Sequence, residues 1–266
     1  MMHVFINGVS VIGPGLDGWE CSLPVLSGRE AYVEGEMPRL TGGRLPTAER
    51  RRATAVTRLA LEAAERAISA DVDPRHMATV FASSGGEVEI VHRIFCELAT
   101  AERQISPTQF HNSVHNAASG YWSIATGSQR ASTSLSCFDD SFSAGLLEAA
   151  VQAVTDGASV LLVAYDFPPL PPIAQFRPLH APFGTALLLN AERSAHSLME
   201  LRLAFDAHPP RDLSRMDDPG LEALRAGNPA ARGLPLLAAL AAREPADILL
   251  SCALTGSLRL RAQPCG

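Results

Sequence analysis

Residues 106–166 carry the pattern that most constrains the fold of this chain. Apolar residues at helical spacing predict a helix over residues 112–126 and a second one over residues 141–156, and a glycine follows each. A short strand over residues 132–136 lies between them, and a nearly all-apolar strand, residues 159–164, comes last. Such a strand is typical of a sheet covered by helices on both faces. The stretch therefore predicts an α/β fold.

The turn between the short strand and the second helix is the candidate functional site. It reads Cys137, Phe138, Asp139, Asp140, Ser141, so one thiol and two carboxylates stand at a helix N-terminus. Free backbone N–H groups and the helix dipole favour negative charge there. Two interpretations stay open: Asp139 and Asp140 contact a substrate, or they cap the helix. Cys137 is either a reactive thiol or a small buried apolar residue.

The same stretch resembles the N-terminal half of the β-ketoacyl synthases, a family with the thiolase fold. Asn116, Gly120 and Gly127 form an N-x3-G-x6-G run. A strand, a nucleophile turn, a helix that ends in glycine and an apolar strand follow in the family's order, and the resemblance covers roughly residues 1–190. It implies a layered α/β/α architecture with essentially one ketosynthase half.

We expect this thiolase-like half over residues 1–205 and a short C-terminal extension, residues 206–266, that packs on the same core. The chain is 266 residues long and 47% hydrophobic, which is enough for a full core. Residues 166–182 are rich in proline and predict a surface excursion. Local patterns predict further strands at residues 4–12, 78–82, 185–190, 199–205, 247–252 and 257–262, and helices at 19–26, 47–67 with Thr47 as the cap, 88–98, near 221 and at 234–242.

The turn departs from the family at its nucleophile. A gapless count from Asn116 through Gly127 places the family's nucleophilic cysteine on Asp139, whereas Cys137 stands two residues earlier, about 6–7 Å away along a strand. A carboxylate cannot form the thioester that condensation requires. The family's two later catalytic histidines also lack counterparts, because the contexts of His180, His196 and His208 do not match them. The resemblance therefore implies a nucleophile position that no longer acts as one.

The function that the resemblance implies is a non-catalytic chain-length-factor subunit. Its partner would be a true β-ketoacyl synthase, and the pair would elongate polyene or fatty acyl chains on an acyl carrier protein. The run HNSVHNAASGYWSIATG is most similar to the corresponding subunits of aryl polyene type II polyketide synthases. We expect residues 110–116 and 132–136 at the subunit interface. The candidate cavity or interface residues are Phe110, His111, Asn112, His115, Asn116, Cys137 and Phe138.

The alternative is an enzyme that acts alone. An acyltransferase or thioesterase-type enzyme would use Cys137, or Asp139 with a nearby histidine. The sequence offers no identifiable base for either residue, and it contains no G-x-S-x-G elbow. The subunit hypothesis is therefore the stronger of the two.

Charge and cysteine usage exclude several other classes. The net charge of −6 argues against a nucleic-acid partner, and all 22 basic residues are arginine. The five cysteines form no C-x-x-C pair, which speaks against a disulfide framework and favours a reduced cytoplasm. We expect neither a signal peptide nor a membrane span. We expect no cofactor and no metal, because His111 and His115, four apart on the predicted helix, are too few to hold an ion.

Overall fold

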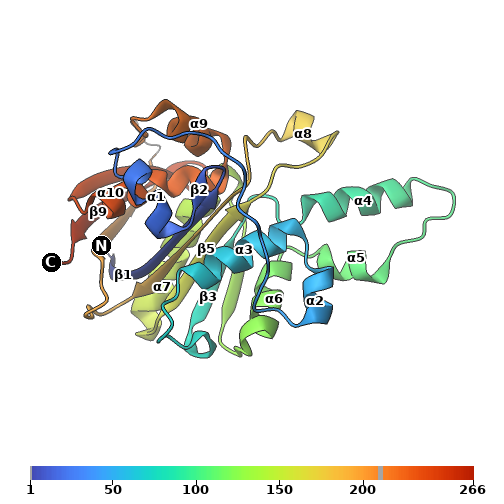
Figure 1. The fold of residues 1–266 in the computed structure, drawn as a ribbon, viewed down its shortest axis with the longest axis horizontal. Coiled ribbons are helices and arrows are strands. Elements are labelled where there is room, and N and C mark those ends of the chain that lie inside the picture. The colour runs from blue at the N-terminus through green and yellow to red at the C-terminus, as the bar shows by residue number, and fades with distance from the viewer. Residues whose placement is uncertain (1, 209–211) are drawn as a thin grey trace.

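The computed structural model describes residues 2–208 and 212–266, and these build one mixed sheet with helices on both faces (Figure 1). The strands are β1 (Met2–Gly13), β2 (Leu16–Asp17), β3 (Ala78–Ala82), β4 (Ser132–Leu135), β5 (Val160–Asp166), β6 (Phe183–Asn190), β7 (Met199–Asp206), β8 (Ala246–Cys252) and β9 (Gly256–Pro264). The α-helices are α1 (Trp19–Leu26), α2 (Thr47–Arg52), α3 (Ala55–Arg66), α4 (Val88–Leu98), α5 (Pro107–Asn112), α6 (Ala117–Thr126), α7 (Ser141–Asp156), α8 (Ile173–Phe176), α9 (Pro219–Gly227) and α10 (Leu234–Ala242). The 3₁₀ turns are η1 (Pro74–His76), η2 (Phe138–Asp140) and η3 (Pro229–Gly233).

The sheet has the strand order β4-β3-β5-β6-β1-β7-β9-β8, with β2 beside β1. β3 is parallel to both β4 and β5, and every later pairing along the sheet is antiparallel. All seven residues of β5 are buried, as its apolar sequence predicts for a central strand. β4 forms one edge of the described sheet. At the other edge Ser214 covers β8, because its N–H donates to Leu249 O and its hydroxyl accepts from Leu249 N.

Two apolar layers hold the helices against the sheet. On one face α7, η3 and α10 pack over the central strands, and on the other face α3 and α6 do so. Gly145 lets α7 approach β3 closely, since a Cβ there would stand 2.7 Å from the Ala82 Cβ. Gly127 and Gly157 end α6 and α7 with φ of 71° and 59°, in the left-handed region that glycine adopts without strain. The predicted α/β/α layering is confirmed.

The last 61 residues extend this fold. Residues 206–266 supply β8, β9 and the helices α9 and α10, and their apolar side chains join the same core cluster as those of β1 and α7. β7 pairs with β1 on one side and with β9 on the other, so the sheet passes through residue 205 without a break. The division at that residue stays a prediction.

Two predicted helices have wrong bounds: one is divided in the structure, and the other begins later than predicted. The helix expected at 47–67 is α2 and α3, and the cap of α3 is Thr54, whose hydroxyl accepts from Thr57 N at 2.9 Å. Thr47 lies within α2, which has no side-chain cap. The helix expected at 112–126 begins only at Ala117, as α6, because Asn112 ends the separate helix α5 and residues 113–116 lie between the two. Polar side chains at each break bond to the backbone or to distant groups, which competes with helix continuation.

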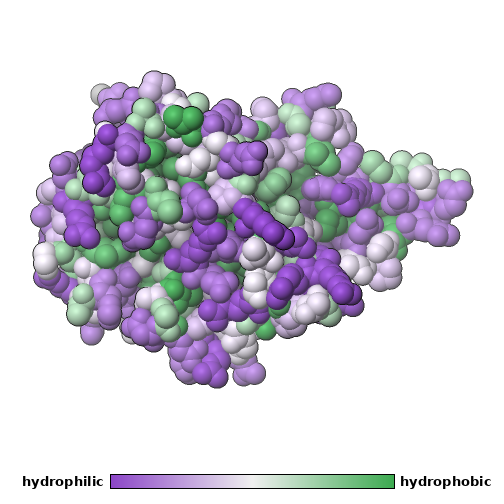
Figure 2. Space-filling view, in the orientation of Figure 1, coloured by the Kyte–Doolittle hydropathy of each residue, from purple (hydrophilic) through white to green (hydrophobic). Residues whose placement is uncertain are grey.

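The α4–α5 arm, residues 88–112, extends away from the body of the molecule (Figure 1). Phe95, Leu98 and Phe110 on this arm are exposed. Elsewhere the face seen in Figure 2 is mostly hydrophilic, and its apolar residues form small separate patches. Single exposed apolar residues are normal on a soluble surface, so the arm stands out by carrying three of them on short helices.

Candidate functional site

The predicted turn lies where β4 ends and α7 begins, and we call residues 137–141 the elbow. The Ser141 hydroxyl closes it, accepting from Cys137 N at 3.0 Å and donating to Phe138 O at 2.8 Å. Asp140 is buried, and its Oδ2 accepts from Leu254 N at 2.7 Å. α7 has no side-chain cap, so of the two open interpretations of Asp139 and Asp140 the capping one is wrong. The structure instead uses the two carboxylates to attach other segments to the elbow.

Phe138 holds the strained position of the elbow. Its φ is 53°, in the left-handed region that a non-glycine residue occupies at a cost of about 1 kcal/mol or more. The side chain is 55% exposed. Strained strand-to-helix turns present one side chain at the end of a sheet. Here that side chain is an aromatic ring, one residue before Asp139, and the assignment of Asp139 to the family's nucleophile position stays a prediction.

Arg177, from the segment between β5 and β6, joins the two elbow side chains. Its guanidinium carbon lies 3.8 Å from the centre of the Phe138 ring. Its Nη1 lies 2.6 Å from Asp139 Oδ1. The cation therefore stacks on the ring and neutralises the carboxylate at the same time. Sequence reasoning missed Arg177, although it is the one arginine in a proline-rich stretch.

A cavity of about 190 Å³ adjoins the elbow. Asp139, Asp140, Arg225 and Arg232 line it together with residues of β8. Burial lowers the pKa of Arg232, and the neighbouring Arg225 lowers it further, whereas the two elbow carboxylates act in the opposite direction. Each charge in this cluster thus has a compensating neighbour, and Arg225 itself is held by Glu222 at 2.7 Å. Charged side chains of both signs thus line the cavity beside the apolar side chains of Leu213, Leu249 and Leu250.

The surroundings of Cys137 favour the protonated thiol over the thiolate. Burial raises the pKa of its thiol, and the negative charge of Asp140 raises it further. A reactive cysteine needs the opposite shift, which a histidine or another cation beside the sulfur would supply. Cys252 at the end of β8 is buried as well, and burial raises its pKa to about 11. The thiols near the elbow therefore stay protonated at neutral pH.

Four of the remaining residues predicted for the site form no hydrogen bond or ion pair with the elbow in the residues that the structure describes: Phe110, His111, Asn112 and Asn116. Asn112 is buried, and its amide donates to Arg52 O at 3.0 Å and accepts from the Tyr121 hydroxyl at 3.0 Å, which ties α5 to α2 and α6. Phe110, His111 and Asn116 are exposed. The expectation that His111 and His115 share one helix is wrong, because His111 lies in α5 and His115 lies in the break between α5 and α6. No cluster of metal-ligand side chains occurs within the described part of the chain.

His115 belongs instead to a polar cluster beside the elbow. Sequence patterns did not predict the other members of this cluster, Ser83, Ser84 and Asp166. The His115 Nε2 donates to Ser83 O at 3.0 Å. Asp166, at the end of β5, accepts from the Ser83 hydroxyl at 3.0 Å and from the Ser84 N–H at 2.8 Å. Ser136, the residue before the elbow, donates to Ser84 O at 3.1 Å. Burial raises the pKa of Asp166 to about 6. This cluster fixes the turn from which the α4–α5 arm begins.

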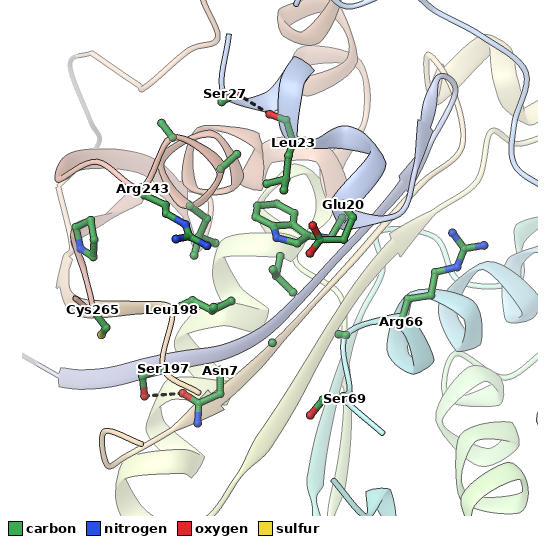
Figure 3. A pocket seen from close by; sticks show the side chains of 18 of the residues that line it. Asn7, Glu20, Leu23, Ser27, Arg66, Ser69, Ser197, Leu198, Arg243 and Cys265 are labelled. Carbon is green, nitrogen blue, oxygen red and sulfur yellow. Dashed lines mark hydrogen bonds between the residues drawn. The ribbon is translucent and has the colours of Figure 1, made fainter. Parts of the chain in front are cut away.

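A larger cavity, about 880 Å³, lies far from the elbow in sequence and in the fold. Figure 3 shows it between α1, α10 and the C-terminal segment, with Arg243 and Arg66 on opposite sides and Glu20 between them. Asn7 lies at a β-bulge of β1 and bonds to Ser197 at 2.9 Å. None of the side chains predicted from the sequence to act in catalysis lines this cavity.

Residues 28–245 match the family model for the β-ketoacyl synthase N-terminal domain. The chain belongs to this family. No curated protein matches the sequence significantly. Within residues 2–208 and 212–266, every helix is too short or too polar to traverse a lipid bilayer.

Solved structures of ketosynthases with chain length factors share the fold. A ketosynthase in complex with its chain length factor from Xenorhabdus doucetiae aligns with a TM-score of 0.71 and 23% identity over 98% of this chain and 100% of the matched chain. The ishigamide ketosynthase/chain length factor aligns with a TM-score of 0.74 and 13% identity over 100% of both chains. A type II polyketide synthase acyl carrier protein in complex with its ketosynthase gives 0.74 and 13% over 99% of both chains. The predicted thiolase-like fold is confirmed.

Proposed function

We propose that this chain is a non-catalytic, chain-length-factor-type subunit of a β-ketoacyl synthase. It would pair with a true ketosynthase and help to elongate polyene or fatty acyl chains on an acyl carrier protein, as in aryl polyene assembly. The observation that carries the proposal is the elbow: Phe138 holds the strained position, and Asp139 is paired with Arg177. A turn built in this way shapes a surface but supplies no nucleophile.

The chemistry that a condensing enzyme needs has no support around the elbow. A thiolate requires a neighbouring cation or histidine, and the pKa of Cys137 is raised. His115, which lies beside the elbow, donates its Nε2 hydrogen to the backbone carbonyl of Ser83. An oxyanion and a decarboxylating substrate would therefore need groups from another subunit. A partner with an intact active site meets that need, and the names of the structural relatives support the same choice.

The β4 edge is the surface that we assign to this partner. α6 and α7 flank the strand, because the Ser134 hydroxyl donates to Ser119 Oγ at 3.1 Å and the Gln152 amide donates to Thr133 Oγ1 at 2.9 Å. These helices leave Ile124, Val151 and Val154 exposed. An open strand with apolar flanks suits pairing with another sheet edge. The surface includes residues 132–136, where the sequence predicted contact.

Co-expression with candidate ketosynthases tests the proposal. We expect this chain to co-purify with one of them at equal stoichiometry, and light scattering should give the mass of a heterodimer. The chain alone should form no product from a malonyl thioester. A chain that ignores every ketosynthase and stays a well-behaved monomer contradicts the proposal.

Cys137→Ser separates the subunit from the stand-alone enzyme. In the assembled pair we expect the first condensation to keep its rate within about two-fold, since a structural thiol contributes packing and no chemistry. Acyl transfer to the chain, followed by mass spectrometry of the intact protein, gives the second readout. A loss of about 10³ in rate, in a variant that still folds and pairs, would assign the chemistry to Cys137.

A further inference from the structure

The proline-rich segment, residues 167–182, crosses the end of the sheet between β5 and β6 with few attachments. Its helix α8 has only four residues, and Phe176 at the end of this helix is 85% exposed. Figure 1 shows α8 standing away from the sheet. The C-terminal end of the segment is anchored by His180, whose N–H donates to Gly227 O at 2.9 Å. Between that anchor and β5, Arg177 is the side chain that ties the segment to the elbow.

The Arg177 side chain makes two different contacts at once. Its guanidinium carbon lies over the Phe138 ring, 3.8 Å from the ring centre. Its Nη1 lies 2.6 Å from Asp139 Oδ1. Nη2 is buried and has no hydrogen-bond partner. An ammonium group could pair with the carboxylate but could not stack a planar face on the ring as well. The arrangement therefore depends on arginine and not merely on positive charge.

The contact matters because Phe138 has little else to fix it. A left-handed backbone with a half-exposed ring leaves the side chain free to change rotamer unless a neighbour covers it. Arg177 covers one face of the ring, and Asp139 fixes Arg177 in turn. The segment and the elbow thus restrain each other through three side chains.

We propose that Arg177 is a positioning residue that fastens the proline-rich segment to the elbow and sets where the Phe138 ring stands. A second consequence rests on the proposed function: in the assembled pair, the ring position limits the length of the acyl chain. Loosening Arg177 should then lengthen the product without removing any catalytic group.

The first test uses the isolated chain and amide hydrogen exchange of peptides that cover residues 136–142 and 170–180. Arg177→Ala should speed exchange in both peptides about five-fold, because a cation–π contact and an ion pair are lost together. Arg177→Lys keeps the ion pair and should give a smaller increase. The matched control is Arg259→Ala, which removes a half-exposed ion pair with Asp247 on another surface and should leave both peptides unchanged. Rates in Arg177→Ala equal to those of the wild type overturn the proposal.

The second test measures product length in the reconstituted pair. Arg177→Ala should shift the products toward longer chains, and Phe138→Ala should do the same, whereas Arg259→Ala should not. If Arg177→Ala speeds amide exchange in the isolated chain but leaves the acyl product lengths unchanged, the link between this contact and product length is overturned. A wild-type chain that pairs with no ketosynthase refutes the proposed function instead, and the exchange result is read independently of it.

Discussion

Asp166 shows what a single buried residue does in this fold. Its Oδ1 accepts from Ser83 and Ser84, while its buried Oδ2 has no hydrogen-bond partner. Burial outweighs these bonds and raises its pKa from 3.8 to about 6. The residues in contact are more than 80 positions apart in the chain, so no local pattern predicts them. No local pattern predicts the ion pair between Arg177 and Asp139 either. For this reason the sequence identified the elbow but not the contacts that hold it.

The raised pKa predicts a pH dependence of stability. Because the folded chain binds the Asp166 proton more tightly than the unfolded chain, this contribution is fully present below pH 3.8 and is lost as the pH rises through about 6. The loss amounts to about 3 kcal/mol at most. Asp166→Asn should remove this pH dependence of the unfolding free energy, because asparagine does not titrate. Urea unfolding of both proteins between pH 4 and 8 is the measurement, and parallel profiles would show that Asp166 does not titrate in this way.

Helices and strands could be predicted where local patterns decide them. The buried run of β5 and the glycine ends of α6 and α7 appear in the structure as the sequence indicated. The helix breaks could not be predicted, because they depend on distant partners. Asn112 ends α5 while its amide bonds to Arg52 O, 60 residues earlier, and Thr54 begins α3 while its hydroxyl donates to Glu87 Oε1 at 2.7 Å. The apolar periodicity of one segment carries no information about either of these long-range hydrogen bonds.

Thr54, not Thr47, is the N-cap of α3, so substitutions at the two threonines should differ in their effect on stability. Thr54→Ala removes the cap of α3 and one donor to the buried Glu87 carboxylate, which should cost about 2 kcal/mol of unfolding free energy. Thr54→Ser should recover most of the loss. Thr47→Ala should cost almost nothing, since Thr47 caps no helix. Denaturant midpoints of the three variants give the answer, and equal losses at both positions would contradict this account of the two helices.

At the scale of the whole molecule, the proposed pairing places apolar helix faces beside an open strand. Replacing Ile124 and Val151 together by glutamate should weaken association with the ketosynthase at least ten-fold, because both side chains are exposed beside β4 and would be buried in the pair. Val33→Glu is the control, as Val33 is also an exposed apolar residue but lies in the loop beside Gly15. Analytical ultracentrifugation of each mixture measures the effect. Undiminished pairing of the double variant would exclude this surface.

The hydrogen bonds between Ser214 and Leu249 have a consequence for how large an assembly this chain can form. A sheet with two free edges invites chain after chain to add, and such growth has no natural end. Within the described residues, Ser214 bonds to Leu249 on the outer side of β8, whereas β4 has no strand on its outer side. Addition of a further strand to this chain is therefore favoured at β4 over β8, which limits the directions in which an assembly could grow from it.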